Sequence, residues 1–319
     1  MSALFRSVWQ VSGGPANRSY ADVFLKYGVA LIGPGDTGAW YAGLKDEDYE
    51  GHYVRHLATE MSKGDILLLR KGLSTIQALG LVAGDYEYLS QFDDVNGWDL
   101  QHARRVRWFP LPANYTFHGS VFGASPPRLS RVTSPDVLDY ANRFVNSPPT
   151  DWQLASLPEL PLGEPALQEV PDYLQALLAQ VADLSPLYWN RTAFGDHPTE
   201  DELLAHLVVP FLRALGWQPE QIGVKWRKID VCVFDRLPRT PEHCRFVVEA
   251  KRLGEGIEGA RMQAKGYLDE LGVTRDIVVT DGIRYRVYRG DNEFEPLAYA
   301  NLADLKHSAL AVLDKLKRP

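Results

Sequence analysis

The sequence has little cysteine and no long hydrophobic run. Its 319 residues include two cysteines, Cys232 and Cys244, which are too few for a disulfide framework or a multi-cysteine zinc site. No segment approaches the roughly 20 consecutive apolar residues that cross a bilayer. The opening residues, MSALFRSVWQ, lack the apolar core of a signal peptide. We therefore expect a protein of the reducing cytoplasm that has no membrane partner.

Several common catalytic motifs are also missing. The segment GPGDTG at 33–38 lacks the Gly-Lys-Ser/Thr of a phosphate-binding loop, so nothing indicates ATP hydrolysis. His52 and His56 have the spacing of two metal ligands on a helix, but Tyr53 stands where an HExxH motif has its glutamate. No set of serine, histidine and aspartate has a recognisable context. The chemistry must therefore come from other residues.

The chain has no excess of basic charge, since its formal net charge is -7. The acidity is concentrated in the middle of the chain. Residues 1–133 hold 13 basic and 13 acidic side chains, residues 134–200 hold 2 and 10, and residues 201–319 hold 19 and 18. Because a local cluster of basic groups can bind phosphate in a protein that is acidic overall, nucleic acid remains a possible partner.

What is present suits a globular protein of two domains: hydrophobic residues make up 45% and charged residues 24% of the chain. The N-terminal part reads as short strands separated by turn residues, which is typical of a small β-barrel. The expected strands are 7–12, 28–33, 64–72, 77–88 and 103–111, with helices near 19–27 and 46–62. We assign this domain to residues 1–120.

The middle of the chain is rich in proline and would not support long regular elements. Proline clusters occur at 125–128, 147–152 and 158–165, and a short helix is expected at 135–144. Helical spacing of apolar residues begins at Leu174. We assign a connector to residues 121–170 and a second domain to residues 171–319.

The second domain has the clearest pattern. A helix is expected from Thr199, a good N-cap, to Gly216, a good stop, with a kink at Pro210. Strands are expected at 227–235 and 244–253, a helix at 257–272, and a hairpin around Asp281-Gly282 within 275–290. This order predicts layered α/β structure with a mixed central sheet, and a two-domain α+β chain overall.

Three charged residues lie within these apolar strands. Glu249 and Lys251 are two positions apart in one strand, so their side chains share a face. Asp230 is embedded in the preceding strand, where an unpartnered acid is unfavourable. Two carboxylates from neighbouring strands make a hard-oxygen site suited to Mg²⁺, and a lysine beside them could orient water or stabilise charge on phosphorus.

A second interpretation of these residues is structural. Glu249 and Lys251 could form a solvated salt bridge on an edge strand. The two cysteines suit small core positions, and Gln263 could be a surface amide.

Asp230 followed by Glu249-Ala250-Lys251 resembles the PD-(D/E)xK nuclease superfamily, and most of all the N-terminal nuclease domain of type I restriction enzyme R subunits and its stand-alone relatives. The resemblance covers about residues 198–290. It implies a restriction-endonuclease-like fold that uses Mg²⁺, or Mn²⁺ in its place. It further implies that Asp230 and Glu249 are metal ligands, Lys251 the catalytic lysine, Gln263 a supporting glutamine and Glu200 the leading-helix acid.

Glu200 and Glu202 require separate interpretations. Thr199 and Glu202 have the spacing of a capping box, in which Glu202 reaches back to the helix N-terminus. Glu200 has no such structural role and is the better candidate for the site.

The N-terminal domain resembles the EVE branch of the PUA-like barrels over about residues 5–115, on segments such as GVALIGPGDTGAWYAG and IQALGLVAGDYEY. This resemblance implies an aromatic pocket for a modified base, with a flipped or single-stranded ligand. The candidate pocket residues are Trp9, Ser12, Gly13, Gly14, Trp40, Tyr41 and Trp98, and the candidate phosphate-binding residues are Arg104, Arg105 and Arg107. Several of the tryptophans could instead pack the barrel core, and the arginines could be a solvated strand face.

The sequence and its resemblances together predict a modification-dependent DNA endonuclease that restricts foreign DNA such as that of phages. A homodimer is expected if both strands are cut, because one active site cuts one strand. Two alternatives remain open: a nucleic-acid-binding module whose nuclease fold is inactive, and a nuclease directed at RNA.

Overall fold

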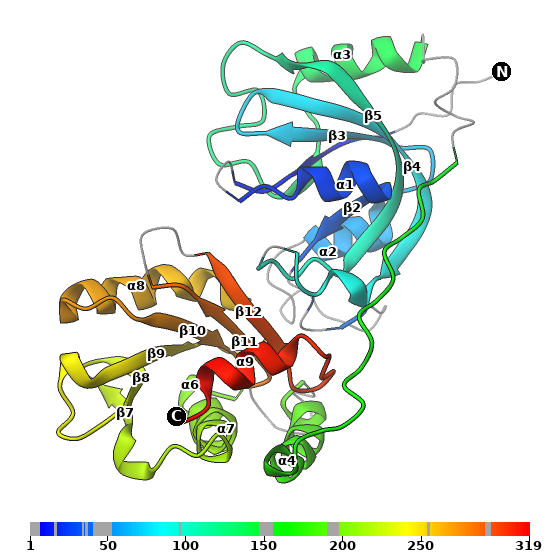
Figure 1. The fold of residues 1–319 in the computed structure, drawn as a ribbon. Coiled ribbons are helices and arrows are strands. Elements are labelled where there is room, and N and C mark those ends of the chain that lie inside the picture. The colour runs from blue at the N-terminus through cyan, green and yellow to red at the C-terminus, as the bar shows by residue number, and fades with distance from the viewer. Residues whose placement is uncertain are drawn as a thin grey trace. The chain divides into compact units, whose positions relative to one another are not determined.

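The computed structural model describes residues 7–15, 18–33, 35, 38–40, 53–95, 97–146, 156–189, 198–253, 256–290 and 295–319. The chain divides into two compact units, Met1–Gly163 and Glu164–Pro319. Each contains a six-stranded mixed sheet, so the chain is a two-unit α+β protein (Figure 1). No helix in the described part of the chain is long and apolar enough to cross a membrane.

The first unit is built on a curved sheet that forms a half-barrel (Figure 1). Its strand order is β2-β5-β4-β3-β1-β6, in which β1 and β3 are parallel and the other neighbours antiparallel. The elements in chain order are β1 (Val8–Ser12), α1 (Ala21–Tyr27), β2 (Val29–Ile32), α2 (Tyr53–Arg55), the π-helical turn η2 (His56–Glu60), β3 (Ile66–Lys71), β4 (Thr75–Tyr88), η3 (Ser90–Phe92), β5 (His102–Thr116), β6 (Leu129–Arg131) and α3 (Pro135–Asn146).

Alternation along the strands gives this sheet two apolar faces. On one face, Trp9 and Leu67 pack with Phe24 of α1. On the other, Ile66 packs with Val137 of α3. Because β6 is a strand of this sheet and α3 packs on its second face, part of the predicted connector belongs to the half-barrel unit.

The second unit has the strand order β12-β11-β10-β9-β8-β7, and β9 and β10 are its parallel pair. Its elements are α4 (Asp172–Trp189), α6 (Glu200–Leu203), the π-helical turn η4 (Leu204–Val208), α7 (Val209–Ala214), η5 (Pro219–Gln221), β7 (Ile222–Trp226), β8 (Ile229–Phe234), η6 (Pro241–His243), β9 (Cys244–Ala250), η7 (Ile257–Gly259), α8 (Ala260–Leu271), β10 (Asp276–Thr280), β11 (Arg284–Tyr288), β12 (Pro296–Asn301) and α9 (Ala309–Leu316).

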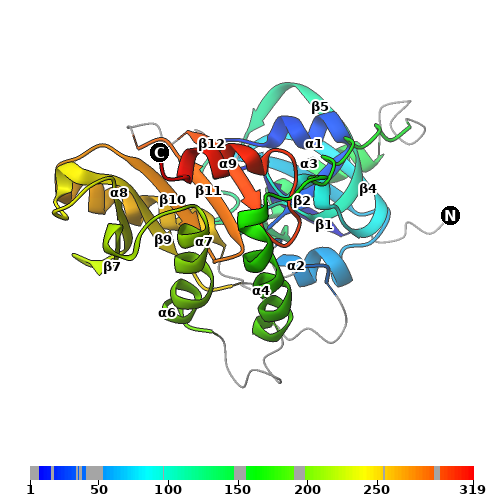
Figure 2. The ribbon, with the colours of Figure 1, turned by 60° about the horizontal axis from the view of Figure 1, so that its bottom comes forward.

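Helices cover both faces of this sheet. α8 connects β9 to β10 and packs on one face through Ala264 and Leu268, beside Val247. The apolar residues of α4, α7 and α9 pack on the other face, as Figures 1 and 2 show. Leu167 also donates its backbone N–H to Leu305 in this unit, so the predicted connector 121–170 is divided between the two units.

The long helix predicted to begin at Thr199 is present but interrupted. The π-helical turn η4 leads into α7, whose first residues include Pro210. Proline has no N–H to donate to the preceding turn, which explains why the irregularity lies there. Cys232 and Cys244 are free and buried in the sheet, as core residues would be.

Arg104 differs from its predicted role in a phosphate-facing cluster. Its side chain is 4% exposed, and its guanidinium donates to the carbonyl oxygens of Leu57 at 2.7 Å and Met61 at 2.6 Å. It also donates to the carbonyls of Ala58 and Gly84. Carbonyls at the end of a helical segment lack partners within that segment. Arg104 therefore holds η2 against β5 and faces the interior.

We expect Arg104→Met to lower the free energy of unfolding by about 3 kcal/mol, because buried carbonyl groups would lose their donor. Chemical denaturation of the whole chain measures this. Arg143→Met, which alters an exposed arginine of α3, is the matched control and should change stability by less than about 0.5 kcal/mol. Equal stabilities of the two variants would contradict the structural role.

Candidate functional site

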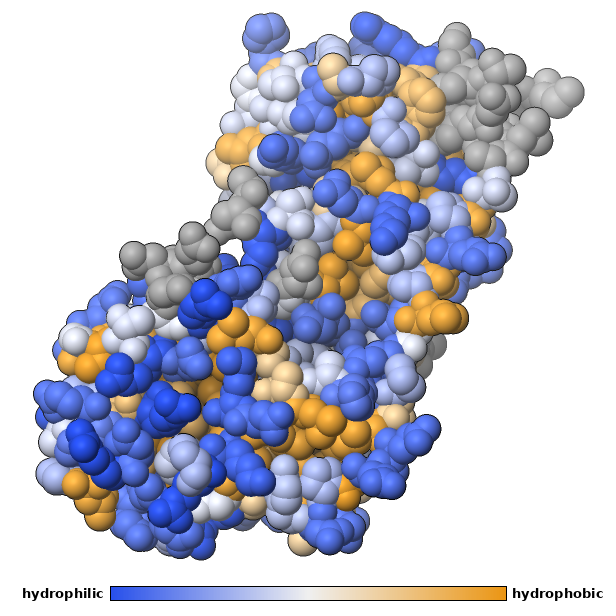
Figure 3. Space-filling view, in the orientation of Figure 1, coloured by the Kyte–Doolittle hydropathy of each residue, from blue (hydrophilic) through white to orange (hydrophobic). Residues whose placement is uncertain are grey.

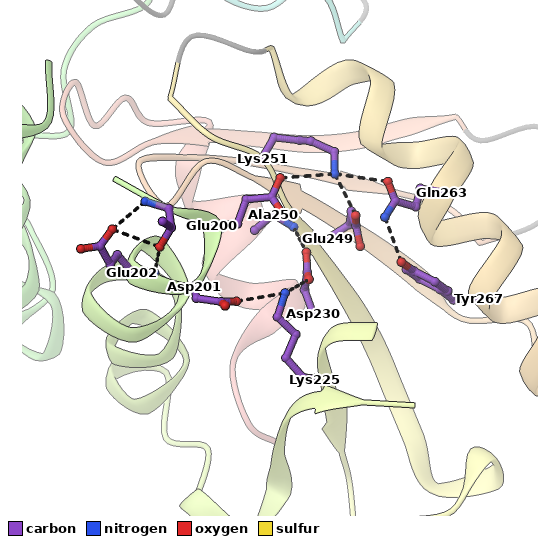
Figure 4. A network of polar contacts seen from close by, with 11 residues as sticks. Glu200, Asp201, Glu202, Lys225, Asp230, Glu249, Ala250, Lys251, Gln263 and Tyr267 are labelled. Atoms are coloured by element: carbon purple, nitrogen blue, oxygen red, sulfur yellow. Dashed lines mark hydrogen bonds and ion pairs between the residues drawn. The ribbon is translucent and has the colours of Figure 1, made fainter. Parts of the chain in front are cut away.

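Two carboxylates meet where β8 and β9 lie side by side. The antiparallel register places Val231 opposite Val248, so the adjacent residues Asp230 and Glu249 come together. Strand alternation turns both away from the face that carries Val231 and toward the face covered by α8. The backbone N–H of Ala250 donates to Asp230 Oδ2 at 2.8 Å, which fixes one carboxylate against the neighbouring strand (Figure 4).

Glu249 is the most deeply buried of the predicted site residues in the second unit, since its side chain is 1% exposed. Loss of hydration raises the pKa of Glu249 to about 7, and the nearby carboxylates of Asp230 and Glu200 act in the same direction, against Lys251. Its Oε2 atom is buried and has no hydrogen-bond partner among the described residues. A buried carboxylate oxygen without a donor is suited to receive a cation.

Lys251 lies between the acids. Its ammonium donates to Glu249 Oε1 at 2.9 Å and to Gln263 Oε1 at 3.2 Å, and lies 3.8 Å from Glu200 Oε1 (Figure 4). Burial opposes its charge, but the hydrogen bond with Glu249 and the surrounding acids raise the pKa of Lys251 above its ordinary value. The lysine is therefore positively charged at neutral pH.

Gln263 comes from α8 and reaches Lys251 from the side. Its Nε2 donates to the hydroxyl of Tyr267 at 2.9 Å, one helical turn further on. This bond orients the amide so that its oxygen faces Lys251, and Gln263 thus positions the ammonium.

The two glutamates at the start of α6 have different roles. Glu202 accepts from the backbone N–H of Thr199 at 2.7 Å, while its own N–H donates to the Thr199 hydroxyl at 3.1 Å. This is the predicted capping box. Glu200 lies on the side of Lys251, so the structure brings Asp230, Glu249, Lys251, Gln263 and Glu200 into one neighbourhood (Figure 4).

Sequence reasoning missed a second lysine at this place. Lys225 donates to Asp230 Oδ1 at 2.7 Å and lies 3.1 Å from Asp201 Oδ1 (Figure 4). Burial opposes the charge of Lys225, but these hydrogen bonds raise its pKa above the ordinary value. The signal in the sequence was weak, because Lys225 belongs to a hairpin whose turn could not be placed from its residues.

The donor set fits a hard divalent cation. Asp230 and Glu249 offer carboxylate oxygens, and one of these, Glu249 Oε2, has no donor among the described residues. No three histidine, cysteine, aspartate or glutamate side chains in the described ranges lie close enough to hold a metal by themselves. Mg²⁺ commonly takes one or two protein carboxylates and completes its shell with water and substrate phosphate. The residues present therefore suit Mg²⁺ better than a metal that needs a complete protein cage.

The predicted base-pocket residues do not form one open group. Trp9 is fully buried and donates its Nε1–H to Asp65 Oδ2 at 2.9 Å, so it packs the half-barrel core. Gly13 is also buried, and a Cβ there would lie 2.7 Å from the Cβ of Ala21. Ser12 is half-buried and accepts from Gly14 N–H at 3.3 Å. These four residues serve local structure, and Tyr41 lies outside the described residues.

Trp98 and Trp40 are half-buried at the edge of this core. The guanidinium of Arg18 lies 4.1 Å from the centre of the Trp98 ring, and that of Arg128 lies 5.9 Å away. The Nε1 atom of Trp98 is buried and has no hydrogen-bond partner in the described part of the chain. An aromatic face, two cations and an unused donor make this the best candidate for a base contact.

The other predicted phosphate-binding arginines lie on β5. Arg105 donates to the carbonyls of Pro158 and Gly28, and is half-buried. Arg107 is also half-buried and lies opposite Leu81. With Arg104 in the interior, the three arginines do not form a single exposed cluster.

A cavity of about 410 Å³ lies beside β1 and β6. It is lined by Gln10, Ser120, Val121, Phe122, Gly123, Ser130, Arg131, Val132, Thr133 and Ser134. None of the described residues of the predicted base pocket lines this cavity, although the guanidinium of Arg131 lies 5.0 Å from the centre of the Trp9 ring.

Comparisons with known proteins bear on parts of the chain. The family described as a domain of unknown function (DUF8426) matches residues 9–117. No curated protein matches the chain. Among solved structures, the chain is similar to a fragment described as an HsdR subunit of a type I restriction enzyme from Vibrio vulnificus YJ016, with 16% identity and a TM-score of 0.25. The match covers 37% of this chain and 26% of that one.

The raised pKa of Glu249 predicts a pH-dependent stability in the absence of divalent ions. The folded protein binds this proton more tightly than the unfolded chain does, so stability falls as pH rises from about 4.5 to about 7. Glu249→Gln removes this titration. Relative to wild type, the variant should gain about 3 kcal/mol of stability between pH 4.5 and 8, measured by urea denaturation in EDTA. A difference that stays constant with pH would contradict the assignment.

Proposed function

We propose that the second unit hydrolyses nucleic-acid phosphodiesters with Mg²⁺, and that DNA is its substrate. The observation that carries this proposal is the convergence of Asp230 and Glu249 with Lys251 on one face of the β8–β9 pair. The buried, unpartnered Glu249 Oε2 supports it, since the described residues supply this oxygen with no donor. The order of elements around these residues agrees with the resemblance to PD-(D/E)xK nucleases.

Each residue of the site would have its own role in hydrolysis. Asp230 and Glu249 would hold the cation, which when bound polarises a phosphate and lowers the pKa of a water. Lys251 carries a positive charge beside them and would stabilise the charge that builds on the phosphate oxygens. Gln263, anchored by Tyr267, holds the ammonium in place during this step. Glu200 lies 3.8 Å from Lys251 Nζ, where it can orient the ammonium or a water.

For the first unit we propose that Trp98 takes part in reading a modified base, which would make the enzyme a modification-dependent nuclease that acts on foreign DNA. A planar base can stack on an aromatic face such as the indole of Trp98. Arg128, whose side chain is exposed, lies close to the same ring and can bind a flanking phosphate, whereas Arg18 packs on the ring and donates to the Gly97 carbonyl at 2.8 Å. One catalytic site cuts one strand, so cleavage of both strands would require two copies of the chain.

Two other functions lead to different results. A binding module with an inactive nuclease fold would bind neither Mg²⁺ nor Mn²⁺, which calorimetry detects. An RNA-directed nuclease would bind and cleave an RNA duplex better than modified DNA at the same salt concentration.

We expect Asp230→Asn and Lys251→Met each to reduce the rate of DNA cleavage in Mg²⁺ at least about a hundredfold, because each removes a charge that acts on the reacting phosphate. A nicking assay on modified phage DNA measures the rate. Glu202→Gln alters an acid near the site that only caps α6, and should retain activity. Equal cleavage by wild type, Asp230→Asn and Lys251→Met would remove the assigned site.

Loss of the Trp98 ring tests the reading of the base separately. Trp98→Ala should weaken binding to modified DNA about tenfold to a hundredfold, since stacking on an aromatic ring is worth about 1–3 kcal/mol per base. Binding to unmodified DNA should change little. Tyr115→Ala is the control, because it removes a more exposed aromatic ring of the same unit. Fluorescence anisotropy with both DNAs gives the affinities, and a uniform loss on the two DNAs would argue against base reading.

A further inference from the structure

The hairpin between β7 and β8 carries an unusual set of residues next to the site. Trp226 pairs with Ile229, so Arg227 and Lys228 form a two-residue turn. Their φ angles are 51° and 71°, and φ of Lys225 is 49°. Both turn residues are left-handed, as in a type I′ turn, where asparagine and glycine are preferred. Arg227 and Lys228 therefore occupy two left-handed turn positions in which asparagine or glycine is usually found.

These cations face solvent. The side chains of Lys225, Arg227 and Lys228 are exposed, and the guanidinium of Arg227 lies 4.6 Å from the centre of the Trp226 ring. Figure 3 shows that hydrophilic residues cover most of the surface around β7 and β8. A short tip with three positive charges and a stacked aromatic ring is suited to the phosphate backbone of a nucleic acid.

Lys225 connects this tip to the carboxylates. Its ammonium donates a hydrogen bond to Asp230 Oδ1 at 2.7 Å, and 45% of its side chain is exposed. Asp230 Oδ2 is already held by the backbone of Ala250 at 2.8 Å. A divalent cation that binds Asp230 through Oδ1 must therefore compete with Lys225 for the oxygen.

We propose that Lys225 exchanges Asp230 for a phosphate of the bound nucleic acid when a divalent cation enters the site, so that binding of the cation and of the nucleic acid support each other. This inference rests on the proposed function. Lys225 acts here as a positioning residue: without nucleic acid it competes with the cation, and with nucleic acid it joins Arg227 and Lys228 on the backbone. In this exchange the cation replaces the ammonium on Asp230 Oδ1 and the phosphate replaces Asp230 on the ammonium, while Asp201 Oδ1, now 3.1 Å from the ammonium, is the second carboxylate from which Lys225 has to move.

Calorimetry of Mn²⁺ binding without nucleic acid tests the first half. Lys225→Met should bind Mn²⁺ about tenfold more tightly than Lys228→Met, because both remove one positive charge from the hairpin but the former also frees Asp230 Oδ1. Lys225→Arg keeps a donor for Asp230 and should behave like wild type. Melting temperatures confirm that the variants fold. Equal affinities of Lys225→Met and Lys228→Met would overturn the exchange.

The salt dependence of DNA binding tests the second half. In wild type, replacing EDTA by Ca²⁺ should steepen the slope of log K against log salt by about 0.9, which corresponds to one added phosphate contact. Lys225→Met should show no such increase, whereas Lys228→Met should show it from a shallower starting slope. Gels run after the titration verify that the DNA is intact. If wild type shows no increase, the exchange is wrong; if wild type binds no Mn²⁺, the proposed function itself fails.

Discussion

The arrangement of the candidate site in the second unit depends on holding two carboxylates, Asp230 and Glu249, side by side in a buried position. The β8–β9 register puts Asp230 beside Glu249, where like charges repel and water is scarce. Lys251, which follows β9, donates to Glu249, and Lys225 from the hairpin donates to Asp230. The backbone N–H of Ala250 donates to the second oxygen of Asp230. The surrounding elements supply these partners, so the geometry of the site follows from the need to compensate its charge.

Strand alternation was sufficient to predict which residues of this candidate site share a face. Glu249 and Lys251 share a face because they are two residues apart, and Asp230 lies in the strand that pairs with theirs. The capping box separated Glu202 from Glu200 for a similar local reason. These predictions depend on short-range geometry, which the sequence contains.

Other features depended on tertiary contacts that spacing does not contain. The hydrogen bond of Lys225 follows from left-handed backbone in a turn whose residues, Arg227 and Lys228, are not typical turn formers. Trp9 and Trp98 look alike in the sequence, but the contact with Asp65 places the former in the core. Arg104 could have been separated from Arg105 by alternation alone, since neighbours in a strand face opposite ways.

A proton and ammonium groups act on the two acids of this site, and the divalent cation that we propose would compete with them. A proton competes for Glu249 because its pKa is about 7, an ammonium holds Asp230, and the described residues leave Glu249 Oε2 without a donor. Asp230 and Glu249 are fixed in β8 and β9, so a new cation can bind their oxygens only by replacing a proton or an ammonium. In the proposed exchange, a phosphate of the nucleic acid receives the displaced lysine in competition with Asp201, which lies 3.1 Å from its ammonium. Substrate binding and cation binding would then be linked through the same few atoms.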